Sequence, residues 1–210
     1  MRRFVLIFLV FVSACNSPSK KNLTKQPTDP RIFRAGGVIL RMSGVFVESG
    51  ILDVEELWGK SGLPQELIYK KISELQAWQA FEGPSFIFRD TTNIRNTFFF
   101  TEASYLDVEE GNEEKLFTEF ESVMTENSKK IGATCKLVEN DFFSLSNGDK
   151  VYKMLYEVNY TNEKEYSTTY YITSKMRVVM VIVNNTSDDG EAIVRSMNVD
   201  PYFYEDLIEN

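Results

Sequence analysis

The sequence contains no histidine and only two cysteines among its 210 residues. Without histidine, neither a Ser-His-Asp nor a Cys-His catalytic arrangement can form, and a zinc site with histidine ligands is excluded. The cysteines, Cys15 and Cys135, are too few to supply a thiolate zinc site. The chemistry that remains uses carboxylates, lysines or tyrosines, and we expect neither a metal ion nor a cofactor.

Long hydrophobic runs are also absent. The N-terminal apolar run, Phe4 to Val12, has 9 residues, and such a helix rises only about 13 Å, against about 30 Å for the hydrocarbon core of a bilayer. Arg2 and Arg3 precede the run, and the small residues Ser13 and Ala14 follow it. This order is typical of a secretory signal peptide, which we assign to residues 1–14.

Cys15 stands where such a signal would be cleaved. The segment Val12-Ser13-Ala14-Cys15 resembles the lipobox of bacterial lipoprotein precursors, in which the thiol receives diacylglycerol and a peptidase cuts before it. The resemblance implies a lipid on Cys15 that holds the chain on a membrane of the cell envelope. Asn16, rather than aspartate, implies the outer membrane, facing the periplasm, in a host with two membranes. The alternative is an ordinary secreted protein with an incidental cysteine.

Residues 15–31 are predicted to form a tether between the lipid and the folded part. After the cysteine, this stretch holds three prolines, four basic residues and one apolar side chain, and its net charge is +4 − 1 = +3. So few apolar groups cannot offset the entropy lost on ordering the chain. The positive charge favours a position near anionic lipid head groups.

Residues 32–210 are long enough for one domain, and they are acidic. Subtracting +2 for Arg2 and Arg3 and +3 for the tether from the total of −8 leaves −13. A domain of this charge repels phosphate backbones, so we exclude a nucleic acid as partner. Cys135 lies in a strand-like run, where a small buried side chain is the expected role.

Hydrophobic spacing predicts helices in the first part of the domain and a sheet in the second. Steps of three and four residues predict the helices, and alternation with period two predicts the later strands. Asn147-Gly148 predicts a hairpin with a type I′ turn, and Asp188 and Glu191 have the spacing of a capping box. The predicted helices are 53–58, with Asp53 as cap, 64–80, 113–129 and 189–197; the predicted strands are 38–42, 45–47, 86–88, 97–101 and an antiparallel meander over 133–184.

The meander strands are apolar on both faces. In the strand near residue 155, Tyr152 and Met154 lie on one side while Val151 and Leu155 lie on the other. A sheet with one wet face would alternate apolar and polar residues instead. We therefore predict an α+β fold of the α/β/α sandwich type, with a mostly antiparallel sheet and helices on both faces.

The order of elements resembles the Mog1/PsbP-like fold. The segments that carry the resemblance are the glycine turn and tyrosine-rich strand at 147–157, the strands at 170–173 and 177–183, and the closing helix at 192–197. The resemblance implies a non-catalytic docking module, because members of this group act on protein partners. The aromatic-glycine-proline opening of the photosystem members and the metal-binding histidines of some members are missing, so no binding residue is carried over.

Two sets of side chains are candidates for function. Tyrosine rings offer apolar area with a polar tip; most of these rings are expected to fill the interface between sheet and helices, and Tyr160 and Tyr166 are the expected exposed binding residues. The acidic residues at the predicted helix starts could bind calcium, but no twelve-residue calcium loop is present, and favourable placement at helix N-termini explains them without a ligand. The first set is Tyr152, Tyr156, Tyr160, Tyr166 and Tyr170, and the second is Asp107, Glu109, Glu110, Glu113, Glu114, Asp188, Asp189 and Glu191.

Two functional hypotheses follow. The first is a lipid-anchored, non-catalytic binding or assembly module that docks a protein partner in the cell envelope. The alternative is an enzyme or ligand carrier that acts on an envelope glycan or lipid through carboxylates and tyrosines. The alternative requires a deep pocket where carboxylates meet exposed tyrosines, whereas the first requires only a surface patch.

Overall fold

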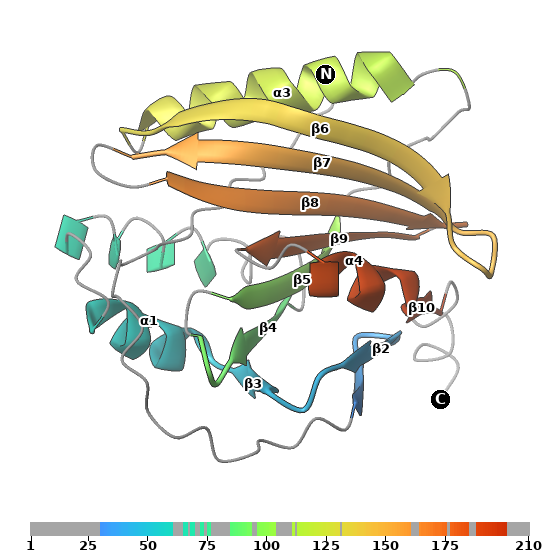
Figure 1. The fold of residues 1–210 in the computed structure, drawn as a ribbon, viewed down its shortest axis with the longest axis horizontal. Helices are drawn as coiled ribbons and strands as arrows, with labels where there is room; N and C mark the ends of the chain where they lie inside the picture. Colours follow the sequence, from blue (N-terminus) through green and yellow to red (C-terminus); the bar gives the residue numbers. More distant parts are fainter. Residues whose placement is uncertain are drawn as a thin grey trace.

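The chain forms an α+β fold around a large antiparallel sheet (Figure 1). This structure is a computed structural model. It describes residues 30–60, 85–93, 96–103, 111, 113–130, 132–160, 164–175, 177–184 and 188–200, together with 65, 66, 68, 69, 72, 73, 75 and 76.

The large sheet has seven strands in the order β3-β4-β5-β9-β8-β7-β6, and every neighbouring pair is antiparallel. The predicted antiparallel meander is confirmed, since β6, β7, β8 and β9 are sheet neighbours in chain order. The strands are β3 (Phe46–Ser49), β4 (Ser85–Asp90), β5 (Thr97–Ala103), β6 (Thr134–Ser144), β7 (Lys150–Asn159), β8 (Lys164–Ser174) and β9 (Arg177–Asn184).

Helices cover one face of this sheet. The long helix α3 (Glu113–Lys130) and the shorter α1 (Ile51–Gly59) bury apolar side chains on it, together with helical positions between 65 and 76. The prediction that Asp53 caps α1 is wrong by three residues: Gly50 is the N-cap, and its N–H donates to Asp53 Oδ2 at 2.9 Å. We call this side of the sheet the helix face.

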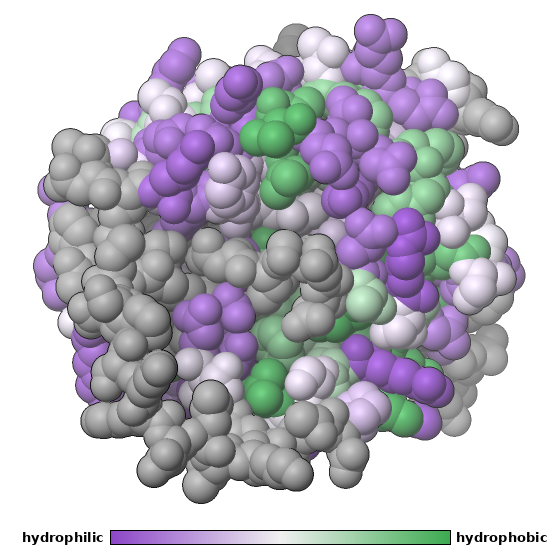
Figure 2. Space-filling model, in the orientation of Figure 1, coloured by the Kyte–Doolittle hydropathy of each residue, from purple (hydrophilic) through white to green (hydrophobic). Residues whose placement is uncertain are grey.

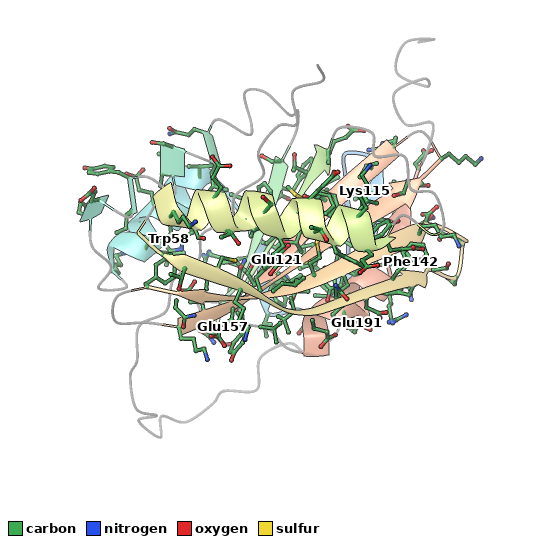
Figure 3. All side chains as sticks on the ribbon, turned by 90° about the horizontal axis from the view of Figure 1, so that it is seen from above. Trp58, Lys115, Glu121, Phe142, Glu157 and Glu191 are labelled. Carbon is green, nitrogen blue, oxygen red and sulfur yellow. The ribbon has the colours of Figure 1, made fainter. Side chains whose placement is uncertain are left out.

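The opposite face is covered in a different way from the prediction. A second antiparallel sheet, in the order β1-β2-β10, packs there beside the short helix α4. This layer is therefore a sheet with one helix, and not the layer of helices that the α/β/α prediction required. Figure 3 shows α3 and α4 on opposite sides of the strands. We call this side the second face. Its covering elements are β1 (Arg31–Ala35), β2 (Val38–Met42), α4 (Asp188–Arg195) and β10 (Asn198–Val199).

The predicted hairpin between β6 and β7 exists, but its turn is not type I′. A type I′ turn needs positive φ at both central residues, whereas only Gly148, with φ of 91°, has it and Asn147 does not. The Leu145 N–H donates to the Asp149 oxygen at 2.8 Å, and the Gly148 N–H donates to the Leu145 oxygen at 3.0 Å. The loop therefore has three residues rather than the two of a type I′ turn. Its last residue, Gly148, has a left-handed conformation, which is the usual form of a three-residue hairpin loop.

Of the helices that the structure describes, none is long and apolar enough to cross a membrane. The predicted signal peptide, Cys15 and the tether up to residue 29 lie outside the described residues. The last ten residues, 201–210, lie outside them as well.

Candidate functional site

The five tyrosines singled out in the sequence do not form one surface. Tyr152 and Tyr156 are buried on the helix face, and Tyr160 is partly buried against the same core. Tyr170 is buried on the second face, and Tyr166, four residues earlier on β8, lies on that side too. Of the two predicted binding tyrosines, Tyr166 is 45% exposed, whereas Tyr160 packs into the core on the opposite face.

Tyr166 belongs to an apolar patch on the second face, which the sequence pattern did not reveal. Val138, at a bulge in β6, is 50% exposed, and the next residue, Glu139, pairs with the partly buried Leu155 of β7. Leu155 in turn is diagonal to Tyr166 across β7 and β8. Figure 2 shows hydrophobic residues among hydrophilic ones over the middle of β6 and β7. We call Val138, Leu155 and Tyr166 the β6–β8 patch.

A small polar cluster holds the Tyr166 ring at the end of the patch. Lys164 Nζ lies 2.6 Å from Glu157 Oε2 and 5.6 Å from the centre of the Tyr166 ring. The Tyr166 hydroxyl donates to Glu157 Oε2 at 3.3 Å, and Asn159 Nδ2 donates to Glu157 Oε1 at 3.0 Å. The hydrogen bonds from Lys164 and Asn159 lower the pKa of Glu157, which therefore stays ionised and keeps the cluster together.

A second charged cluster borders the patch where α4 meets the sheet. Lys153 Nζ donates to Glu139 at 2.8 Å and to Glu191 at 3.0 Å, and Arg195 Nε donates to Glu191 at 2.8 Å. The Arg195 guanidinium also lies 4.1 Å from the centre of the Phe143 ring. Glu191 thus binds two cations, while the Asp188 side chain of the predicted capping box lies outside what the structure describes. Figure 3 places Glu191 and Glu157 on the side opposite α3.

Protonation in this second cluster follows from its hydrogen bonds. Burial alone would lower the pKa of Lys153, but the hydrogen bonds to Glu139 and Glu191 outweigh it and raise the pKa above its ordinary value. The hydrogen bond from Lys153, opposed by burial and aided by the one from Arg195, lowers the pKa of Glu191. Lys153 and Glu191 are therefore both charged at neutral pH.

Replacing Glu191 by glutamine should lower the free energy of unfolding by about 1 kcal/mol at neutral pH and by much less in acid. A carboxylate with a lowered folded pKa stabilises the protein above its unfolded pKa, near 4.3, and this contribution disappears as the pH falls through the folded pKa. Urea unfolding at neutral pH and below about pH 4 measures the difference. The control is Glu48→Gln, because Glu48 is an exposed carboxylate without an ion pair among the described residues. The effect of this substitution on stability should be the same at both pH values.

Arg177 occupies a small pocket between the two sheets. The pocket has room for about one water molecule and is lined by apolar residues, Glu102 and Arg177. Arg177 Nε donates to Glu102 Oε1 at 3.0 Å, and its other nitrogens donate to the backbone oxygens of Gly36 and Asp200. None of the tyrosines discussed above lines this pocket, so it does not combine carboxylates with exposed rings.

Cys135 is a neutral, partly buried thiol on the helix face. Burial, with a smaller contribution from Glu121, raises its pKa to about 12. Among the described residues, no group of three or more carboxylates and cysteines is placed to hold a metal ion. What the described surface offers is therefore an apolar patch bordered by paired charges, an arrangement suited to contact with another macromolecule.

No protein-family model and no curated protein matches this sequence. A solved structure does match: the solution structure of cyanobacterial PsbP (CyanoP) from Synechocystis sp. PCC 6803, with a TM-score of 0.55. The alignment covers 88% of this chain and 98% of that one, at 10% sequence identity.

The fold is PsbP-like.

The resemblance inferred from the order of elements is thus confirmed at the level of the PsbP-like fold. A second solved structure, of the putative regulator PA94 from Pseudomonas aeruginosa, described as a protein of unknown function, aligns with a TM-score of 0.33. That alignment is 11% identical and covers 76% of this chain and 85% of the other. A similarity this low adds nothing to the PsbP-like assignment.

Proposed function

We propose that this protein is a lipid-anchored, non-catalytic binding or assembly module that docks a protein partner in the bacterial cell envelope. The PsbP-like fold carries the proposal, since the group of proteins that its sequence resembles acts on protein partners. The lipobox-like segment that ends at Cys15 supports the anchor, and Asn16 supports an outer-membrane position facing the periplasm.

The β6–β8 patch is the surface that we assign to the partner. Val138 and Tyr166 are half exposed, although side chains of this kind are usually buried or sparse on a protein surface. The Glu157–Lys164 pair and the Glu139–Lys153 pair border the patch. An apolar centre with a charged rim is the usual composition of a protein–protein interface.

The test is a cross-linking pull-down of the tagged, membrane-tethered protein, with a photo-reactive amino acid at position 138. We expect one stoichiometric envelope protein, cross-linked from position 138 and not from position 52. Leu52 of α1 is also apolar and is 75% exposed, so it is a matched control position far from the patch in sequence. A clean preparation without a protein partner would contradict the proposal, and screens for glycan and lipid binding would then be the next step.

Two substitutions separate the contributions of anchor and patch. Val138→Asp should reduce recovery of the partner at least about tenfold, because a charge in the centre of an interface leaves a desolvated group unpaired. Leu52→Asp should leave recovery unchanged. Cys15→Ala should remove the protein from the membrane fraction and lower the yield of the cross-linked partner, and unaltered membrane attachment would contradict the lipid anchor.

A further inference from the structure

The outer face of the small sheet combines isoleucine and arginine in alternation. On β1 and β2, Phe33 and Leu40 turn toward the core, so the neighbouring residues on each strand turn outward. Ile32 lies opposite Arg41, and Arg34 lies opposite Ile39. Ile32 is 56% exposed, and both arginines are exposed. Figure 2 shows strongly hydrophilic side chains beside hydrophobic ones over this region. We call Ile32, Arg34, Ile39 and Arg41 the β1–β2 face.

The positive charge of the β1–β2 face is unusual for this domain. Residues 32–210 carry a net charge of −13, yet no carboxylate of the described residues forms an ion pair with Arg34 or Arg41. The carboxylates Glu102, Glu139, Glu157 and Glu191 are each paired with other cations. The two arginines therefore have their charges available to an anionic partner.

The β1–β2 face directly follows the tether in the chain. The strand β1 begins at Arg31, 16 residues after Cys15, and the stretch between them includes Lys20, Lys21 and Lys25. A chain of that length reaches at most about 55 Å when fully extended. A lipid on Cys15 thus keeps this face within reach of the bilayer and places further positive charge between the two.

We propose that the β1–β2 face lies on the anionic phospholipid head groups of the membrane that holds the anchor. The inference rests on the proposed lipid on Cys15. Arginines near an anionic surface bind its head groups, and the exposed Ile32 adds apolar contact at the interface. Figure 1 shows β6 along the upper part of the molecule and β2 in its lower part, with β7, β8 and β9 between them in the view, so membrane contact by β2 is compatible with partner contact near β6.

The contact is electrostatic, weak and reversible. Each arginine is expected to favour the docked state by a factor of about five on an anionic membrane. Salt screens this attraction, since the Debye length falls from about 10 Å at 0.1 M to about 3 Å at 1 M. The lipid on Cys15 remains the main attachment, and the β1–β2 face fixes how the domain is oriented on the bilayer.

The experiment uses the full-length lipidated chain in vesicles of phosphatidylcholine, with or without a quarter of phosphatidylglycerol. A polarity-sensitive dye is attached at position 32 in an Ile32→Cys, Cys135→Ala protein. We expect a blue-shifted emission in the anionic vesicles, loss of the shift in high salt, and no shift in the neutral vesicles. The same dye at position 138, on the β6–β8 patch, should show no shift in either kind of vesicle.

The double substitution Arg34→Glu, Arg41→Glu should lower the ratio of docked to undocked domain at least about 25-fold. Lys115→Glu, Lys129→Glu makes the same change in charge at exposed positions of α3 and should leave the shift at position 32 intact. An unshifted dye on protein that co-sediments with vesicles would overturn only the docking of this face. Protein that does not co-sediment at all would overturn the lipid anchor, and an equal shift in neutral vesicles would overturn head-group recognition.

Discussion

Replacing Arg177 by methionine should lower the free energy of unfolding by about 3–5 kcal/mol. Arg177 is only 6% exposed, and it joins three segments that are far apart in the sequence. Its Nε donates to Glu102 Oε1 at 3.0 Å, Nη2 donates to the Gly36 oxygen at 2.8 Å, and Nη1 donates to the Asp200 oxygen. Methionine fills similar volume but leaves the carboxylate and both carbonyl oxygens without these donors.

Urea unfolding followed by circular dichroism measures the Arg177 effect. Arg34→Met is the matched control, because that arginine is exposed and has no ion pair among the described residues; its effect should stay within about 0.5 kcal/mol. Arg177→Lys should fall between the two, since the single nitrogen of lysine cannot reach all three acceptors that the three guanidinium nitrogens of Arg177 bind. A loss below about 1 kcal/mol for Arg177→Met would show that the small sheet is held without this side chain.

Tyr152 should respond in opposite ways to loss of its ring and loss of its hydroxyl. Tyr152→Ala is expected to lower the free energy of unfolding by about 3–5 kcal/mol, because the fully buried ring packs against Phe142 at 4.8 Å and Phe117 at 5.6 Å between ring centres. Its hydroxyl is buried with no hydrogen-bond partner among the described residues. Tyr152→Phe should therefore leave stability unchanged or raise it by up to about 1 kcal/mol.

Tyr156→Phe is the comparison for the hydroxyl. Tyr156 is just as buried, but its hydroxyl donates to the sulfur of Met154 at 3.4 Å, so its removal should cost a few tenths of a kcal/mol (~0.5). The same urea titration measures all three variants. Burial raises the pKa of Tyr152 to about 12, so the ring is neutral under any ordinary assay condition. A loss of more than about 1 kcal/mol in Tyr152→Phe would mean that the hydroxyl has a partner after all.

Local sequence patterns predicted much of the sheet, because strand periodicity and turn formation depend mainly on residues that are neighbours in the chain. Successive apolar residues along β9, without polar residues in alternation, mark both faces of this strand as apolar, and the structure buries both. The turn at Asn147-Gly148 shows the limit of such a pattern. The glycine permits positive φ, but whether one or two residues adopt it depends on how many residues the paired strands leave in the loop.

The second sheet was not foreseen, because only β2 was predicted as a strand and the other two strands have weak local signals. Arg31–Ala35 follows directly on a proline-rich stretch, and β10 is only two residues long. β10 exists because Asn198 and Val199 pair with Ile39 and Val38, some 160 positions earlier in the chain. Pairing between segments so far apart in the chain produces no periodic sequence pattern in either segment, because each segment could equally pair with another strand.

The exposed surface was predicted only in part for a related reason. Tyr160 and Tyr166 were chosen for their place near a hairpin end, and the strand register then put them on opposite faces. The sequence does not predict that Val138 is exposed, because its exposure comes from a bulge in β6 where two residues oppose one residue of β7. The adjoining charges of Lys153 and Glu191 meet only when α4 packs on the sheet.

Composition and local pattern alone establish a two-sided apolar sheet, amphipathic helices, an acidic domain without histidine chemistry, and a lipobox-like start. Tertiary structure decided what covers the second face, which tyrosine reaches the surface and which charges meet. The two kinds of feature differ in the sequence separation over which the interactions behind them act. Periodicity and turn propensity act over a few residues, whereas the Arg177–Gly36 bond and the β2–β10 pairing join positions more than a hundred residues apart, and only packing selects them.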